Sequence, residues 1–182
     1  MILASLSPTT GLLLAAAALL AAAGAAKLER PAPTGLALAR LGLPGSDLVV
    51  RALGGAEIAS ATAAAFLAGW WALPVAVLYL GFALFSGAQV RRAAATGEAA
   101  DCGCFGDSSA PIGWSHVLLN VALGVAAVLA AAARADGLLT GLSDDLVATL
   151  VVTSLAALAA VGIRALLTDL PALRALRRNE AA

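Results

Sequence analysis

The sequence predicts an all-α, polytopic membrane protein, a helical bundle with about five transmembrane helices. Of its 182 residues, 62% are apolar and 12% are charged, whereas soluble domains carry about 25% charged residues. The mean hydropathy is +0.96. Several uncharged runs reach the roughly 18–20 residues that a helix needs to cross the hydrocarbon layer. The formal net charge of zero gives no basic field for binding nucleic acid.

The five expected spans cover residues of about 7–26, 52–69, 73–90, 114–133 and 146–163. The stretch from Arg51 to Arg91 contains a single intervening charge, Glu57. As one helix it would be roughly 58 Å long at 1.5 Å per residue, nearly twice the hydrocarbon thickness. Two spans are therefore expected, with a reversal at residues 69–74. The tryptophan pair there suits the membrane–water interface, and the proline suits a first helical turn.

The transmembrane domain is expected to cover residues 1–167, with a polar cysteine loop at 91–113 and a basic tail at 168–182. The connector at 27–51 is rich in proline and glycine, and its residues 35–41 could form a short amphipathic segment at the interface.

Basic residues are distributed very unevenly between the two sides of this five-span arrangement. Ten of the eleven fall on one side: Lys27, Arg30, Arg40, Arg51, Arg91, Arg92, Arg164, Arg174, Arg177 and Arg178. Only Arg134 falls on the other side. By the positive-inside rule the basic side is cytoplasmic, which also places the cysteine loop on the cytoplasmic face.

The cysteine loop contains the only two cysteines of the chain, Cys102 and Cys104, separated by Gly103. A disulfide between two cysteines that are separated by one residue needs a sharply bent backbone. Glycine allows this bend because it adopts positive φ at little cost. Gly106 adds a second flexible position. A strained disulfide is easily reduced, so the pair is interpreted as a dithiol/disulfide exchange centre. Incidental cysteines are the less favoured interpretation.

Metal binding is the more specific of the two alternatives to thiol exchange in this loop. Two thiolates together with Asp101, Asp107 or His116 could bind zinc or copper. A lone Cys-x-Cys supplies only two ligands, so no metal site is assigned.

Three polar residues in the spans are supporting candidates. Glu57 lies about six residues into the second span, where it could handle protons or tie helices together by hydrogen bonding. His116, the only histidine, opens the fourth span and could accept a proton during thiol exchange, although an interfacial filler role is favoured. Asn120 follows one turn later on the same face, where a bond within the bundle is favoured over a contact with a quinone-like ligand.

Several of these residues together resemble a known family. The sequence CGCFG at 102–106, PIGW at 111–114, Asn120, AKL at 26–28 and Glu57 resemble the methylamine utilisation protein MauE family, which belongs to the wider DoxX-like group. The resemblance covers roughly residues 10–135, and CGCFG with the following tryptophan and asparagine is its specific part.

The resemblance implies a multi-pass protein of the cell membrane, in contact with the lipid bilayer and active in methylamine metabolism. It implies a role in maturing a methylamine dehydrogenase, whose exported small subunit is rich in disulfides. The chain would then be a thiol–disulfide oxidoreductase acting on a thioredoxin-like or exported disulfide-containing partner. A quinone is a candidate electron acceptor by analogy with membrane thiol oxidoreductases; the residues themselves name no cofactor.

The chain departs from the family pattern in two places. Leu119 stands where an arginine is expected before the asparagine, and the fifth span and tail extend beyond the resemblance. The implied task also conflicts with the charge distribution, because exported substrates call for thiols outside the cytoplasm. The alternative function is a non-catalytic membrane partner or a small-solute or metal carrier, with Glu57 and the thiols lining a path.

Overall fold

The structure is a computed structural model that describes residues 8–97 and 112–180. Every regular element in these two ranges is helical. In chain order they are α1 (Pro8–Glu29), α2 (Pro31–Arg40), α3 (Asp47–Leu67), the 3₁₀ turn η1 (Gly69–Trp71), α4 (Ala72–Thr96), α5 (Trp114–Ala132), α6 (Leu138–Asp144) and α7 (Leu146–Glu180).

Five helical segments are long and apolar enough to cross a membrane. They are Thr9–Glu29, Asp47–Leu67, Gly69–Thr96, Trp114–Ala132 and Leu146–Ala165. Large apolar side chains such as Leu84 and Leu158 lie exposed on the outside of these helices, as expected for a surface that faces lipid. The predicted all-α bundle with about five transmembrane helices is confirmed.

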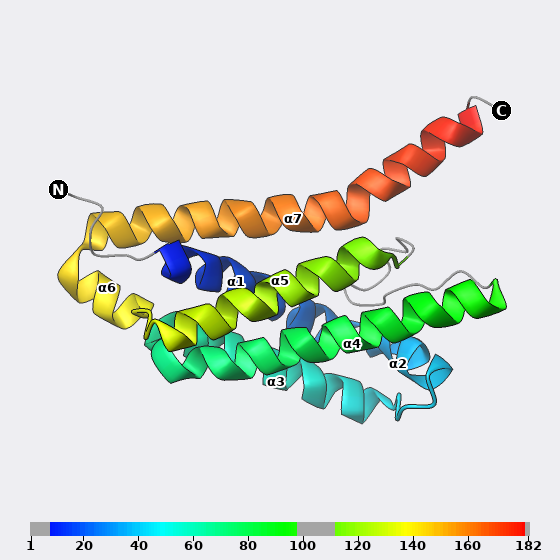
Figure 1. The fold of residues 1–182 in the computed structure, drawn as a ribbon, viewed down its shortest axis with the longest axis horizontal. Helices are drawn as coiled ribbons and strands as arrows, with labels where there is room; N and C mark the ends of the chain where they lie inside the picture. The colour runs from blue at the N-terminus through cyan, green and yellow to red at the C-terminus, as the bar shows by residue number, and fades with distance from the viewer. Residues whose placement is uncertain (1–7, 98–111, 181–182) are drawn as a thin grey trace.

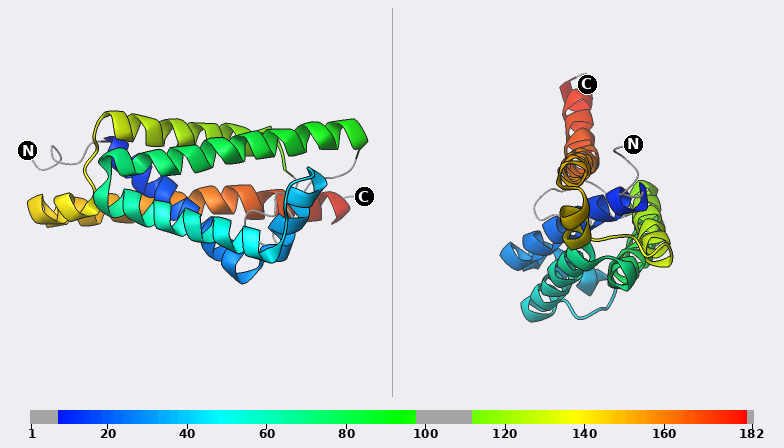
Figure 2. Two further views of the ribbon diagram at one scale, coloured as in Figure 1. Left: turned by 90° about the horizontal axis from the view of Figure 1, so that it is seen from below. Right: turned by 90° about the vertical axis from the view of Figure 1, so that its left-hand side faces the viewer.

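Helix α1 is the central helix of the bundle. It contacts α2, α3, α4, α5 and α7, whereas α5 packs mainly against α4 (Figures 1 and 2). The main core is built largely from small residues and includes Leu13, Leu20, Val75 and Ala127, all at most 1% exposed. Alanine allows close helix packing in a membrane, where small residues dominate helix–helix contacts.

The spans alternate in direction, so one end of the bundle gathers the basic side chains. Helices α1 and α4 end there, and α3 and α5 begin there, as Figure 1 shows. We call it the basic end because Lys27, Arg40, Arg51 and Arg92 lie at the helix ends that meet there. Arg134 follows α5 at the opposite end.

The α3–α4 reversal lies opposite the basic end. Ala68 and Gly69 both adopt positive φ, at 44° and 55°, and the Gly69 amide donates to the Ala135 carbonyl at 2.9 Å. Trp70 and Trp71 are more than half exposed, which is where amphipathic rings sit at a membrane surface. The reversal is therefore held by a hydrogen bond to the chain that follows α5.

Two helices are longer than the sequence patterns suggested. The amphipathic segment expected at 35–41 is part of a ten-residue helix, α2, that begins at Pro31. Helix α7 runs for 35 residues to Glu180, through the position of Pro171 and into the expected tail. Figure 1 shows α7 changing direction in its last third, the part that contains this proline. A proline removes one helical hydrogen bond and commonly bends a helix without ending it.

Candidate functional site

The predicted exchange centre, Cys102 and Cys104 with Gly103 and Gly106, lies outside the residues that the structure describes. Its flanks are described. Helix α4 ends at Thr96, with Gly97 in the left-handed conformation as its cap, and α5 begins at Trp114. Helices α4 and α5 pack against each other, and the described residues on both sides of the cysteine segment lie at the basic end.

The most strongly buried charges in the described residues form an ion pair between α1 and α3. Lys27 Nζ lies 2.9 Å from Glu57 Oε1 and 3.0 Å from Glu57 Oε2. The two side chains are only 3% and 0% exposed. An isolated charge inside a membrane costs about 2.5–3.5 kcal/mol on insertion scales, so each member of this pair depends on the other.

Two glycines bring the helices close enough for this pair to form. A Cβ on Gly24 would lie 2.6 Å from the Gly54 carbonyl oxygen, and one on Gly54 would lie 2.7 Å from the Gly24 oxygen. Gly24 precedes Lys27 by three residues, and Gly54 precedes Glu57 by three. The backbones therefore touch at the glycines. Each glycine also lies opposite the charged residue of the other helix, because a Cβ on Gly24 would lie 3.1 Å from Glu57 Cβ and one on Gly54 would lie 3.1 Å from Lys27 Cβ.

Helix α4 closes the site on a third side. The Lys27 ammonium lies 5.1 Å from the centroid of the Phe82 ring, within range of a cation–π attraction. One turn earlier the Tyr79 hydroxyl donates to the Ala16 carbonyl at 2.7 Å, which fixes α4 against α1. Both contacts lie on one face of α4, because the two aromatic residues are three positions apart.

The same face of α4 continues toward the basic end with two fully buried polar residues, Ser86 and Gln89. The Gln89 amide donates to the Ala37 carbonyl of α2 at 2.8 Å, and the Arg92 guanidinium donates to the Arg40 carbonyl at 2.5 Å. These bonds satisfy carbonyls at the C-terminal end of α2, which its own helix leaves without partners. Helix α4 therefore holds α2 against the bundle.

His116 and Asn120 lie together at the start of α5. The Gly113 amide donates to His116 Nδ1 at 3.3 Å, and the Asn120 side-chain amide donates to the His116 carbonyl at 2.9 Å. His116 thus caps its own helix through the ring. In the described part of the chain, neither residue is hydrogen-bonded to the Lys27–Glu57 pair.

Comparison with protein families matches residues 4–134 to the methylamine utilisation protein MauE family. The chain belongs to the MauE family. The matched region contains α1–α5 and therefore the whole Lys27–Glu57 site, the start of α5 and the cysteine segment. Comparisons with curated proteins and with solved structures found no match.

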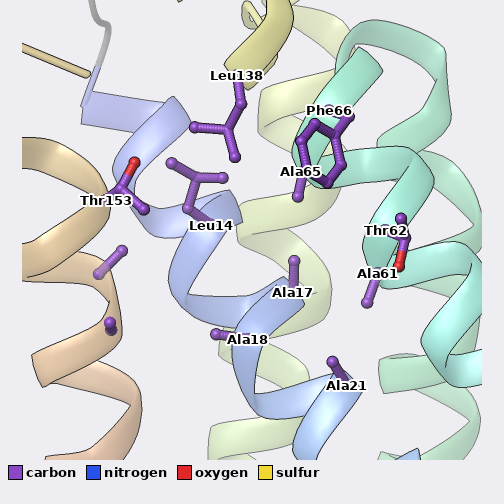
Figure 3. A pocket seen from close by; sticks show the side chains of 12 residues that line it. Leu14, Ala17, Ala18, Ala21, Ala61, Thr62, Ala65, Phe66, Leu138 and Thr153 are labelled. Carbon is purple, nitrogen blue, oxygen red and sulfur yellow. The ribbon is translucent and has the colours of Figure 1, made fainter. Parts of the chain in front are cut away.

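Helix α7 lies outside the MauE region and contributes to a separate feature, an apolar groove of about 220 Å³. Its floor is α1 and its walls are α3 and α7, with Leu138 of α6 and Phe66 at one end (Figure 3). Among its described lining residues, only Thr62 and Thr153 are polar. The groove lies in the half of the bundle that is away from the basic end.

The sequence identified Glu57 but not its partner. Lys27 was counted as a flanking charge of the first span, although the structure buries it. The shared spacing of Gly24 to Lys27 and Gly54 to Glu57 is the signal that could have paired the two helices. Ser86 and Gln89 were not singled out, because single polar residues in an apolar run do not reveal which side of the helix is buried.

Proposed function

We propose that this MauE-family membrane protein uses Cys102 and Cys104 to exchange a disulfide with a partner protein, in support of methylamine dehydrogenase-type maturation. The observation that carries the proposal is that the chain's only two cysteines lie one residue apart. The family match supports it, because the matched region includes both cysteines.

In the oxidising direction, a partner thiolate attacks one sulfur of the Cys102–Cys104 disulfide and forms a mixed disulfide. The second partner thiolate then attacks the partner's own sulfur, which releases Cys102 and Cys104 as a dithiol. Two electrons pass from the partner to the pair, and a quinone would reoxidise the dithiol by analogy with other membrane thiol oxidoreductases. The reverse sequence of steps reduces a partner disulfide.

The charge distribution supports a cytoplasmic position for the cysteine segment. Lys27, Arg51 and Arg92 lie at the same end of the bundle as the end of α4 and the start of α5, and basic flanks remain on the cytoplasmic side. We therefore propose exchange with a partner that is reached from the cytoplasm, or through the membrane interface on that side. The exported dehydrogenase subunit itself is then not the direct exchange partner.

The carrier alternative is less well supported, because it requires Glu57 to line a path. The Glu57 side chain is 0% exposed and both of its oxygens contact Lys27. A structural role in the buried ion pair explains why a glutamate occurs inside this span. No transported solute is needed to explain it.

Thiol labelling tests whether the two cysteines form an exchangeable disulfide and on which side of the membrane they lie. Intact cells and lysed cells are treated with a membrane-impermeant, mass-adding thiol reagent, with and without prior reduction. We expect labelling only in lysed cells, and more of it after reduction. Two thiols that stay fully labelled without reduction under every condition would rule out an exchangeable disulfide.

Two matched variants determine the side without depending on the redox state of the pair. In a Cys102→Ser/Cys104→Ser background, Thr96→Cys reports the basic end and Thr140→Cys reports the opposite end, since both positions are exposed. We expect the reagent to reach only Thr140→Cys in intact cells. Labelling of Thr96→Cys alone would place the cysteine segment outside and overturn the cytoplasmic assignment.

A further inference from the structure

Four side chains on one face of α4 form a row, in which three are buried and Phe82 is partly buried. Tyr79, Phe82, Ser86 and Gln89 are spaced by three, four and three residues, so they share a face. At one end of the row Tyr79 bonds to α1, and at the other Gln89 bonds to α2. Lys27 lies over Phe82 between these contacts. Ser86 therefore lies between the ion pair and the junction with α2.

Two polar atoms in this row have no partner within the described residues. They are Ser86 Oγ and Gln89 Oε1, on side chains that are both 0% exposed. A buried polar atom without a hydrogen bond costs about 1–3 kcal/mol. Buried polar atoms are almost always satisfied, and bound water commonly supplies the bond. Serine in a membrane helix can bond to its own backbone, but Ser86 Oγ does not.

We propose that internal water occupies the junction of α1, α2 and α4 around Ser86 and Gln89, next to the Lys27–Glu57 pair. A water there accepts from or donates to the Ser86 hydroxyl and donates to Gln89 Oε1. Arg92 follows Gln89 by three residues on the same helix and is exposed at the basic end. Water can therefore enter the junction from the aqueous phase at that end.

The charged side chains nearest this junction come from three helices. Lys27 comes from α1, Glu57 from α3 and Arg92 from α4. Besides Glu57, the Lys27 ammonium contacts the Phe82 ring and lies 3.5 Å from the Ala23 carbonyl.

Hydrogen exchange of a single thiol tests for the water. In the Cys102→Ser/Cys104→Ser background, Ser86→Cys introduces a nearly isosteric S–H group whose infrared band is followed after transfer to D₂O. Val75→Cys is the dry control, since Val75 is 0% exposed in the apolar core of the same helix. Thr140→Cys is the wet control. This experiment does not depend on the proposed thiol exchange.

We expect Ser86→Cys to exchange at a rate near that of Thr140→Cys and far above that of Val75→Cys. Equal rates at positions 86 and 75, whether fast or slow, would overturn the proposal. Thermal unfolding of Ser86→Ala gives a second readout. Loss of a hydroxyl that binds water lowers Tm, whereas loss of a dry, unpaired hydroxyl leaves Tm unchanged or raises it. Ser60→Ala on α3 corrects for the intrinsic helix preference of alanine.

Discussion

Lys27 and Glu57 meet across the α1–α3 contact, with Lys27 Nζ 2.9 Å from Glu57 Oε1, although 30 residues separate them in the chain. Both residues belong to predicted spans or their flanks, yet neither is exposed to lipid or water. Their contact requires the two glycines, Gly24 and Gly54, that let the two backbones touch opposite these side chains. The ion pair and the close crossing therefore form one structural unit.

Removal of one member of the pair is predicted to destabilise the bundle strongly. Glu57→Leu leaves the Lys27 ammonium buried without its carboxylate, and breaking a buried pair in this way costs about 3–5 kcal/mol. Lys27→Met leaves the opposite charge unpaired and has a similar effect. The double variant removes both charges and regains most of the loss. The free energy of unfolding in detergent micelles measures all three.

Glu29→Gln is the control for loss of a carboxylate, because Glu29 is exposed at the end of α1. It is expected to change stability by no more than about 0.5 kcal/mol. If Glu57→Leu proved as stable as Glu29→Gln, the pair would not hold α1 and α3 together.

The glycine contact is predicted to tolerate no added methyl group. In Gly54→Ala the new Cβ would lie 2.7 Å from the Gly24 carbonyl oxygen, a backbone atom that cannot turn aside. The helices must separate, at a cost of about 1–3 kcal/mol for overpacking. Unfolding measurements on Gly54→Ala and Gly55→Ala make a matched comparison, because nothing lies within 4 Å of a Cβ on Gly55. Equal stability of the two variants would contradict the close crossing.

The tie between α4 and α2 is predicted to protect α2 from proteolysis. Gln89→Leu removes the bond to the Ala37 carbonyl, and Arg92→Ala removes the bond to the Arg40 carbonyl. With both bonds gone, the end of α2 should open more often and trypsin should cleave faster after Arg40. Arg91→Ala is the control for loss of a neighbouring charge. An unchanged cleavage rate in the double variant would show that other contacts hold α2.

The Tyr79 hydroxyl is predicted to contribute less to the free energy of unfolding than the Tyr79 ring does. Tyr79→Phe removes only the 2.7 Å bond to the Ala16 carbonyl, worth about 0.5–1.5 kcal/mol. Tyr79→Ala also leaves a cavity in the core and should cost about 3–5 kcal/mol. Unfolding free energies of the two variants separate these contributions. A Tyr79→Phe variant as unstable as Tyr79→Ala would mean that the hydrogen bond dominates.

Much of the fold followed from signals that act over one helix or one turn. The five spans depend on the length of apolar runs, and the α3–α4 reversal was indicated by its tryptophans and Pro74. The extent of α7 was different. The sequence placed a separate basic tail at 168–182, but α7 continues through it to Glu180, because the proline in this part removes only one hydrogen bond and bends the helix without ending it.

The sequence alone determined the membrane class, the alternation of the spans, the single cysteine pair and the unusual position of Glu57. These features depend on hydropathy, charge and composition, which can be read along the chain. Only the tertiary structure paired Glu57 with Lys27 and aligned Ser86 and Gln89 along the buried face of α4. Such partners depend on how helices cross and which faces they bury, and packing between distant segments sets both.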